Sequence, residues 1–244
     1  MANMLKTLKK VGETPLELIS RIRLESPELA TERLSYAGRL DPMAEGEMLI
    51  IVGNENDERD KFMGFDKEYE AEFLFGVSTD SGDVLGLITG ESEAEISQSS
   101  IAEISAVVQN FTNIKSQKYP WFSSKTVFGI KLFEHFKRGN LDIERPTRDV
   151  EIKSVEILNF EEKNTEEIKN YIFDSINKVN GDFRQKETIE SWREFFAKNS
   201  RPTLHTLKIK ILVSSGTYIR ALTENFPIPT TLLKLNRTKI ISEL

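Results

Sequence analysis

Apolar and polar residues alternate in two segments of the chain. In residues 67–76, glutamates at 68, 70 and 72 oppose a face made of Tyr69, Ala71, Phe73 and Phe75. In residues 207–213, lysines at 208 and 210 oppose a face of leucine, isoleucine and valine. This period of two predicts strands of an antiparallel sheet with one buried and one exposed face. An unbroken apolar run over 48–52 predicts a short buried strand.

Two segments carry capping signals that predict helix starts. Residues 14–17 combine a threonine cap, a proline at the first helical position and a glutamate three residues after the cap. An apolar stripe follows at Leu16, Leu18, Ile19 and Ile22. A helix is therefore expected from this point. Residues 100–103 form a second box of this kind, which either starts a helix or extends an earlier turn.

Other segments follow neither period or change from one to the other. Residues 35–46 are rich in glycine, proline and small side chains, which predicts a loop. Residues 125–138 turn from a strand into a short helix, and residues 217–220 lead into another. Residues 161–198 predict a pair of charged helices divided at Gly181. Strands and helices that interleave without a βαβ rhythm predict an α+β fold.

Composition limits the classes of function. The 244 residues supply enough apolar side chains for one large core, so we expect a single domain over 1–244. The absence of cysteine excludes disulfides, thiolate catalysis and cysteine-ligated zinc, and it fits a reducing cytoplasm. No apolar run approaches the roughly 18 residues of a membrane span. We therefore expect a cytoplasmic protein with no membrane segment and no secretory signal.

Cofactor signatures are missing as well. The sequence has neither a P-loop nor a Gly-x-Gly-x-x-Gly motif. Residues 79–83 resemble the start of a calcium loop but lack its later ligands, so an Asx turn between strands is the better interpretation. Only two histidines are present, which leaves little for a histidine metal site. We expect neither a metal nor a cofactor.

The net charge of −6 is unevenly distributed along the chain. Residues 41–110 carry 3 basic and 17 acidic side chains, whereas residues 111–140 carry 6 basic and 1 acidic. Residues 201–244 carry 7 basic and 2 acidic side chains. Phosphate binding depends on where cations cluster and not on the total charge. The two basic segments are therefore candidates for phosphate contacts, and solvated charge around a core is the alternative.

One segment of the chain carries a specific motif. It reads Tyr36-Ala37-Gly38-Arg39-Leu40-Asp41-Pro42-Met43-Ala44-Glu45-Gly46. An Asp-Pro pair alone is an ordinary turn signal. The whole string, however, resembles the catalytic loop of the TruB family of tRNA pseudouridine synthases, Gly-His-x-Gly-x-Leu-Asp-Pro-x-Ala-x-Gly. It matches that loop in register at Gly38, Leu40, Asp41, Pro42, Ala44 and Gly46.

Further motifs of that family follow in the family's order. They are an opening lysine motif at 9–15, a Lys-x-Tyr strand at 67–69, a Thr-Asp-[Ser/Thr]-x-Asp turn within 76–86, a glutamine-proline-lysine block within 117–129, a Ser-x-Gly-Thr-Tyr-Ile-Arg strand ending at 220 and a Leu-Arg-Arg-Thr-like motif at 235–238. These ordered matches extend over nearly the whole chain, so a chance resemblance is excluded as an explanation.

The resemblance implies a fold and a reaction. The fold is the pseudouridine synthase fold, an α+β domain with a mixed, mostly antiparallel sheet and flanking helices. The reaction is isomerisation of the T-loop uridine of tRNA (position 55), which is drawn out of its stack, without metal or cofactor. Asp41 would be the catalytic carboxylate, either as nucleophile or as acid–base at the sugar. Arg220 would keep Asp41 ionised and aimed, and Tyr69 would lie against the base and remove the final proton.

The remaining predicted site residues concern substrate binding. Tyr218 and Leu235 match pocket positions of the family, and Lys9 matches the lysine that supports the catalytic loop. Tyr36 stands where the family has a histidine that contacts the substrate loop, and its ring can still stack on a base. Residues 161–198 are interpreted as a family-variable helical insert beside the cleft. We expect no C-terminal PUA-type RNA-binding domain.

The implied partner is the T-arm stem-loop of tRNA, and a monomer is the default oligomeric state. One alternative is a tRNA-binding folding helper with little or no catalysis. Another is pseudouridylation of a different structured RNA. An acidic interaction domain without an RNA role would show no salt-sensitive RNA binding.

Overall fold

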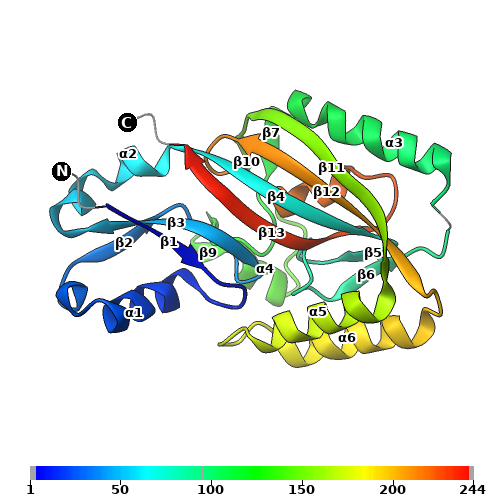
Figure 1. Cartoon of the computed structure of the whole chain (residues 1–244), viewed down its shortest axis with the longest axis horizontal. Coiled ribbons are helices and arrows are strands. Elements are labelled where there is room, and N and C mark those ends of the chain that lie inside the picture. Colours follow the sequence, from blue (N-terminus) through cyan, green and yellow to red (C-terminus); the bar gives the residue numbers. More distant parts are fainter. Residues whose placement is uncertain (1–3, 95, 242–244) are drawn as a thin grey trace.

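A twisted seven-stranded sheet forms the centre of the computed structural model, which describes residues 4–94 and 96–241 (Figure 1). The strands are β1 (Met4–Lys9), β2 (Leu34–Ala37), β3 (Ala44–Val52), β4 (Asp66–Phe75), β11 (Ile152–Asn164), β12 (Thr203–Val213) and β13 (Thr230–Ile241). They lie in the order β1-β3-β13-β4-β12-β11, with β2 also paired to β3. The β13–β3 pair is parallel and the other pairs are antiparallel. The predicted α+β fold with a mixed, mostly antiparallel sheet is confirmed.

Short elements connect these strands. The paired short strands are β5 (Val77–Thr79) with β6 (Ile88–Glu91), β7 (Ser116–Lys118) with β10 (Thr147–Asp149), and β8 (Thr126–Val127) with β9 (Ile130–Lys131). The short helices are η1 (Pro27–Leu29), η2 (Gly53–Glu58), α2 (Arg59–Met63), η3 (Asn110–Asn113), α4 (Leu132–Lys137) and η4 (Ile219–Asn225). The pairing of β7 with β10 makes residues 116–149 one excursion from the sheet, with β8, β9 and α4 inside it.

The two alternating segments form strands, as predicted, and the structure shows that these strands are neighbours in the sheet. Strand β4 pairs with β12, and Tyr69 lies opposite Ile211. Their apolar face is buried in the main core. Glu72 departs from the pattern because it is buried too, with its carboxylate 2.5 Å from Lys163 Nζ.

The predicted loop at 35–46 is too long. Strand β2 ends at Ala37 and β3 begins at Ala44, so the loop covers only residues 38–43. The small residues at its ends pair with neighbouring strands, and such pairing overrides local propensity. Gly46 shows why a glycine is needed there, because a Cβ atom at this position would lie 2.3 Å from the carbonyl oxygen of Arg237.

Helix α1 (Pro15–Glu25) begins with the predicted capping box. The amide of Glu17 donates to Thr14 Oγ1 at 3.3 Å, and the amide of Thr14 donates to Glu17 Oε2 at 2.7 Å. Leu16 was placed on the wrong face, since it is exposed. The buried face is made of Leu18, Ile19 and Ile22. Helix α3 (Gln98–Gln109) is capped by Ser97, so the second box lies inside a helix that starts earlier.

The predicted helical pair consists of α5 (Thr165–Asn177) and α6 (Gln185–Lys198). It begins four residues later than predicted, because β11 continues to Asn164 in register with β12. Gly181 lies in the connection with φ at 90°, so the predicted division is confirmed. The apolar faces of both helices pack against the β5–β6 region and form a second core cluster (Figure 1).

The chain leaves the sheet after Val213. The predicted strand ending at residue 220 is therefore wrong beyond that point: a turn with Gly216 at φ 83° leads into η4, which begins at Ile219. This turn brings Arg220 back toward the 38–43 loop.

Candidate active site

Asp41 lies in the 38–43 loop, which is fixed by backbone hydrogen bonds. The amide of Ala44 donates to the carbonyl of Asp41 at 3.0 Å and closes a tight turn. The amide of Gly12 donates to the carbonyl of Pro42 at 2.8 Å. The turn after β1 therefore supports the loop that presents Asp41.

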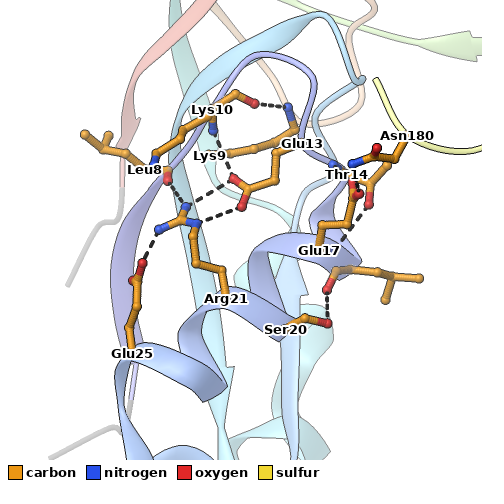
Figure 2. Close-up of polar contacts among 11 residues, drawn as sticks. Leu8, Lys9, Lys10, Glu13, Thr14, Glu17, Ser20, Arg21, Glu25 and Asn180 are labelled. Carbon is orange, nitrogen blue, oxygen red and sulfur yellow. Dashed lines mark hydrogen bonds and ion pairs between the residues drawn. The ribbon is translucent and has the colours of Figure 1, made fainter. Parts of the chain in front are cut away.

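Lys9 lies beneath this loop. Its Nζ atom donates to the carbonyl oxygens of Ala44 at 2.5 Å and Lys10 at 2.9 Å. Burial lowers the pKa of Lys9 to about 8, although the carboxylates of Glu13 and Asp41 oppose that shift. Figure 2 shows the surrounding turn, where Glu13 accepts from Arg21 and from the amide of Lys10. Lys9 is buried behind the loop and is not one of the side chains that form the cavity described below.

The carboxylate of Asp41 is paired with the buried guanidinium of Arg220. Arg220 Nε donates to Asp41 Oδ2 at 2.9 Å. Its two terminal nitrogens donate to backbone carbonyls, Nη1 to Ser81 at 2.8 Å and Nη2 to Phe122 at 2.7 Å. Every nitrogen of the guanidinium has an acceptor in a fixed plane, which aims its Nε at Asp41.

A second carboxylate, that of Asp83, lies near this pair. Burial raises the pKa of Asp83, and the charge of Arg220 opposes that rise. Burial by itself lowers the pKa of Arg220, but the carboxylates of Asp41 and Asp83 raise it above its usual value. Arg220 therefore stays charged in its buried position.

A cavity of about 730 Å³ opens beside the ion pair. Six of the seven predicted site residues line it: Tyr36, Asp41, Tyr69, Tyr218, Arg220 and Leu235. They come from β2, the 38–43 loop, β4, the turn after β12, η4 and β13. The structure thus brings together side chains that are up to 199 positions apart in the chain.

The tyrosines of the cavity have different surroundings. Tyr69 is buried on β4 and lies opposite Arg237 of β13 in the sheet. Burial raises the pKa of Tyr218, whose ring centre lies 5.7 Å from the guanidinium carbon of Arg220. The hydroxyl of Tyr36 accepts from Arg39 Nη2 at 3.3 Å.

The cavity is also lined by five basic side chains that are not among the predicted site residues: Arg39, Arg59, Lys67, Arg148 and Arg237. Lys67 and Arg237 lie in motifs matched to the family, but only Tyr69 and Leu235 of those motifs had been assigned. Arg148 had no sequence signal. It arrives through the β10–β7 pairing, and its guanidinium occupies the space above Gly216, where a Cβ atom would lie 1.9 Å away.

We expect Lys67→Met to remove a pH dependence of stability. Burial, followed by repulsion from Arg237, lowers the pKa of Lys67 from 10.5 to about 8. At pH values between these two pKa values, the unfolded chain therefore binds more protons than the folded chain. Lys67 thus makes the free energy of unfolding rise with pH in this range. The rise is about 2 kcal/mol between pH 8 and pH 10.

Urea titrations at pH 8, 9 and 10 measure this effect as the difference in the free energy of unfolding between wild type and Lys67→Met. Lys61→Met is the control, because Lys61 is exposed and paired with Glu58 at 2.9 Å. A difference that stays flat with pH would show that Lys67 is not a buried charge.

Neither a metal cluster nor a membrane span is found in the described residues. Across 4–94 and 96–241, no three His, Cys, Asp or Glu side chains are grouped so as to hold a metal ion. No helix of that part is both long and apolar enough to cross a bilayer. The two histidines have other contacts: His135 Nε2 donates to the carbonyl of Val127 at 3.0 Å, and His205 lies 3.8 Å from Glu162.

Sequence comparisons match much of this chain to one family. A family model described as TruB family pseudouridylate synthase (N terminal domain) matches residues 27–173. The tRNA pseudouridine synthase B of Psychrobacter cryohalolentis is 31% identical over 157 residues, 64% of this chain and 43% of that protein. That of Fusobacterium nucleatum is 31% identical over 154 residues, 63% of this chain and 51% of that protein. The matched part thus spans about half or less of these relatives.

Structural comparison supports the same fold. The crystal structure of a Cbf5-Nop10-Gar1 complex matches 97% of this chain and 48% of that chain, with a TM-score of 0.55 at 15% identity. An H/ACA RNP bound to a substrate RNA containing 2′-deoxyuridine matches with a TM-score of 0.54 at 13% identity, covering 97% of this chain and 47% of that one. At these identities the likeness concerns the fold alone.

Proposed function

The chain belongs to the TruB family of pseudouridylate synthases, and on that basis we propose that it converts uridine to pseudouridine in the T loop of tRNA, at position 55, with Asp41 as the catalytic aspartate. The observation that carries the proposal is the Asp41–Arg220 ion pair at the wall of a cavity of about 730 Å³. A cavity of this size accommodates a nucleotide drawn out of its stack.

The reaction is an isomerisation. The bond between N1 of uracil and C1′ of the ribose breaks, the base turns, and a bond forms between C5 and C1′. The proton on C5 leaves and N1 gains one, so the atoms balance without a co-reactant. Asp41 acts at the sugar, as nucleophile or as acid–base, and both roles require an ionised, well-aimed carboxylate.

Arg220 supplies that aim. Its guanidinium is buried and bonded to two carbonyls, so it cannot turn away from Asp41 without leaving acceptors unsatisfied. Asp41 itself is about one-third exposed, on the cavity side. The pair is therefore rigid on the protein side and open toward a bound ribose.

The base lies against Tyr69, and the 116–149 excursion holds the RNA backbone. This excursion carries basic side chains at 118, 125, 131, 137, 138, 145 and 148. It reaches the cavity through Ser123, Ser124 and Arg148, all three of which line it. Phe128 is 84% exposed at the β8–β9 turn and is available to stack on an unpaired base. We further propose that residues 1–244 work as one catalytic domain, as a monomer in the cytoplasm.

The test is incubation of the purified protein with an unmodified T-arm transcript, without added metal or cofactor, followed by mapping of pseudouridine. The expected product lies at the T-loop uridine, and a transcript with cytidine at that position stays unmodified. Pseudouridine at another position, or in another RNA only, would contradict the proposed substrate. Binding without any product, at several enzyme concentrations, would contradict the proposed catalysis.

We expect Tyr69→Phe to bind RNA normally but to turn over slowly. The variant keeps the ring that packs on β4 and loses only the hydroxyl, so the fold is retained. Loss of a positioned proton acceptor lowers rates by about 10²- to 10⁴-fold. Single-turnover rates and RNA affinities measure the two effects separately. Tyr171→Phe is the matched control, since Tyr171 lies on α5 outside the cavity. An unchanged rate in Tyr69→Phe would show that Tyr69 only packs in the core.

A further inference from the structure

The connection between α5 and α6, residues 178–184, packs on the segments that surround Asp41. A Cβ atom on Gly12 would lie 2.4 Å from Lys178 Cβ, so this connection touches the turn that supports Pro42. Asn180 Nδ2 donates to Glu17 Oε1 at 2.8 Å, next to the capping box of α1 (Figure 2). The 178–184 connection therefore packs against the turn that supports the 38–43 loop.

Arg184 makes the strongest contacts of this connection. Its two terminal nitrogens form a fork with the buried carboxylate of Asp80, at 2.9 and 3.1 Å. Its guanidinium carbon lies 4.5 Å from the ring centre of Phe122. A two-bond arginine–carboxylate pair and stacking on an aromatic face both hold a guanidinium in one orientation. Arg184 also has φ at 61°, which non-glycine residues seldom adopt.

The two residues that Arg184 contacts are next to, or the same as, the residues whose carbonyls hold Arg220. One of the carbonyls belongs to Ser81, which directly follows Asp80 in the chain. The other belongs to Phe122 itself. A single side chain, that of Arg184, therefore restrains both acceptors that orient the catalytic arginine.

Helix α6 extends this contact along the 80–88 segment. Thr188 Oγ1 donates to the carbonyl of Leu85 at 3.0 Å, and Trp192 Nε1 donates to the carbonyl of Val84 at 3.0 Å. Both contacts are buried, and Thr188 and Trp192 lie four positions apart on one face of α6, which begins directly after Arg184. The segment that supplies Ser81 is thus held by the insert at successive turns.

We propose that Arg184 is a positioning residue for catalysis, which fixes the carbonyls of Ser81 and Phe122 and thereby aims Arg220 at Asp41. Arg184 lies beyond residue 173, where the match to the family model ends, so this support comes from the insert. The catalytic part of the proposal rests on the proposed function. Arg184 acts through other residues, because its guanidinium contacts Asp80, Phe122 and Phe136 and not Asp41.

The test compares Arg184→Gln, Arg184→Lys and Arg193→Gln on the T-arm transcript. Arg193 is the control, since it is an exposed arginine of α6 paired with Glu190 at 3.4 Å. We expect Arg184→Gln to lower kcat by about ten- to a hundredfold, because small misplacements of catalytic groups have effects of this size. KM stays within about twofold, and Arg184→Lys recovers part of the rate because it keeps the charge but not the fork.

The KM value separates positioning from RNA binding. Arg184 also lines a hollow of about 450 Å³ that adjoins the cavity, so it could contact RNA directly. A raised KM with unchanged kcat would assign it to that contact and overturn the positioning role. Equal rates in Arg184→Gln and Arg193→Gln would overturn it as well.

Hydrogen exchange keeps this proposal distinct from the proposed function. Amides of residues 80–88 should exchange faster in Arg184→Gln than in wild type and Arg193→Gln, measured well below the melting temperatures of all three proteins. An inactive wild type would overturn the proposed function and the catalytic role of Arg184, while the exchange data would still decide whether Arg184 fixes the segment. Unchanged exchange would overturn that role whatever the activity.

Discussion

Asp41→Ala should reduce pseudouridine formation by at least about 10³-fold, since it removes the carboxylate that we propose acts on the sugar. The fold should persist, because Asp41 lies in a loop and Arg220 keeps both of its carbonyl partners. RNA affinity should change only a few-fold, since the proposed backbone contacts lie on the 116–149 excursion. Single-turnover rates with excess enzyme, together with filter binding, measure both quantities.

Asp41→Asn sharpens this test, because it keeps the shape and an acceptor oxygen but removes the charge. Asp57→Asn is the matched control: Asp57 is exposed and paired with Arg33 at 2.7 Å, so its amide variant should react at the wild-type rate. An Asp41→Asn protein that binds tRNA, makes no product and helps the RNA fold would separate catalysis from a folding-helper role. Normal product formation in either Asp41 variant would show that the site has been misassigned.

Local patterns predicted the strands and helices whose faces are amphipathic. Alternation located β4 and β12, and the capping signals of residues 14–17 located the start of α1, because each depends on side chains a few positions apart. The family motifs indicated the residues that meet in the cavity. They did so because the same loop, strand and turn recur in the family in the same order.

Contacts between distant segments could not be predicted in this way. The parallel pairing of β13 with β3 determines where β3 begins, and no local period reports it. Arg148 reaches the cavity through the β7–β10 pair, and its place above Gly216 follows from the turn after β12. Arg184 had no family motif to mark it. Its role follows only from the side chains that the fold places around it.

Arg220→Ala should lower turnover nearly as far as Asp41→Ala, by about 10³-fold or more. The loss has two physical causes. Asp41 loses the cation that orients it, and the carbonyls of Ser81 and Phe122 lose their donors in a buried place. Each unsatisfied acceptor costs about 1–3 kcal/mol, so the melting temperature should fall as well. Rates must therefore be measured well below that temperature.

Arg220→Lys distinguishes charge from geometry. An ammonium group keeps the positive charge near Asp41 but cannot place donors on three acceptors in one plane. We expect about a 10²-fold loss of kcat with little change in RNA affinity, because lysine no longer orients Asp41. If the guanidinium only neutralised charge, lysine would replace it well. The control is Arg193→Lys, an exposed arginine that should tolerate the change. A wild-type rate in Arg220→Lys would mean that charge alone is needed, and that the two carbonyls serve the fold and not the reaction.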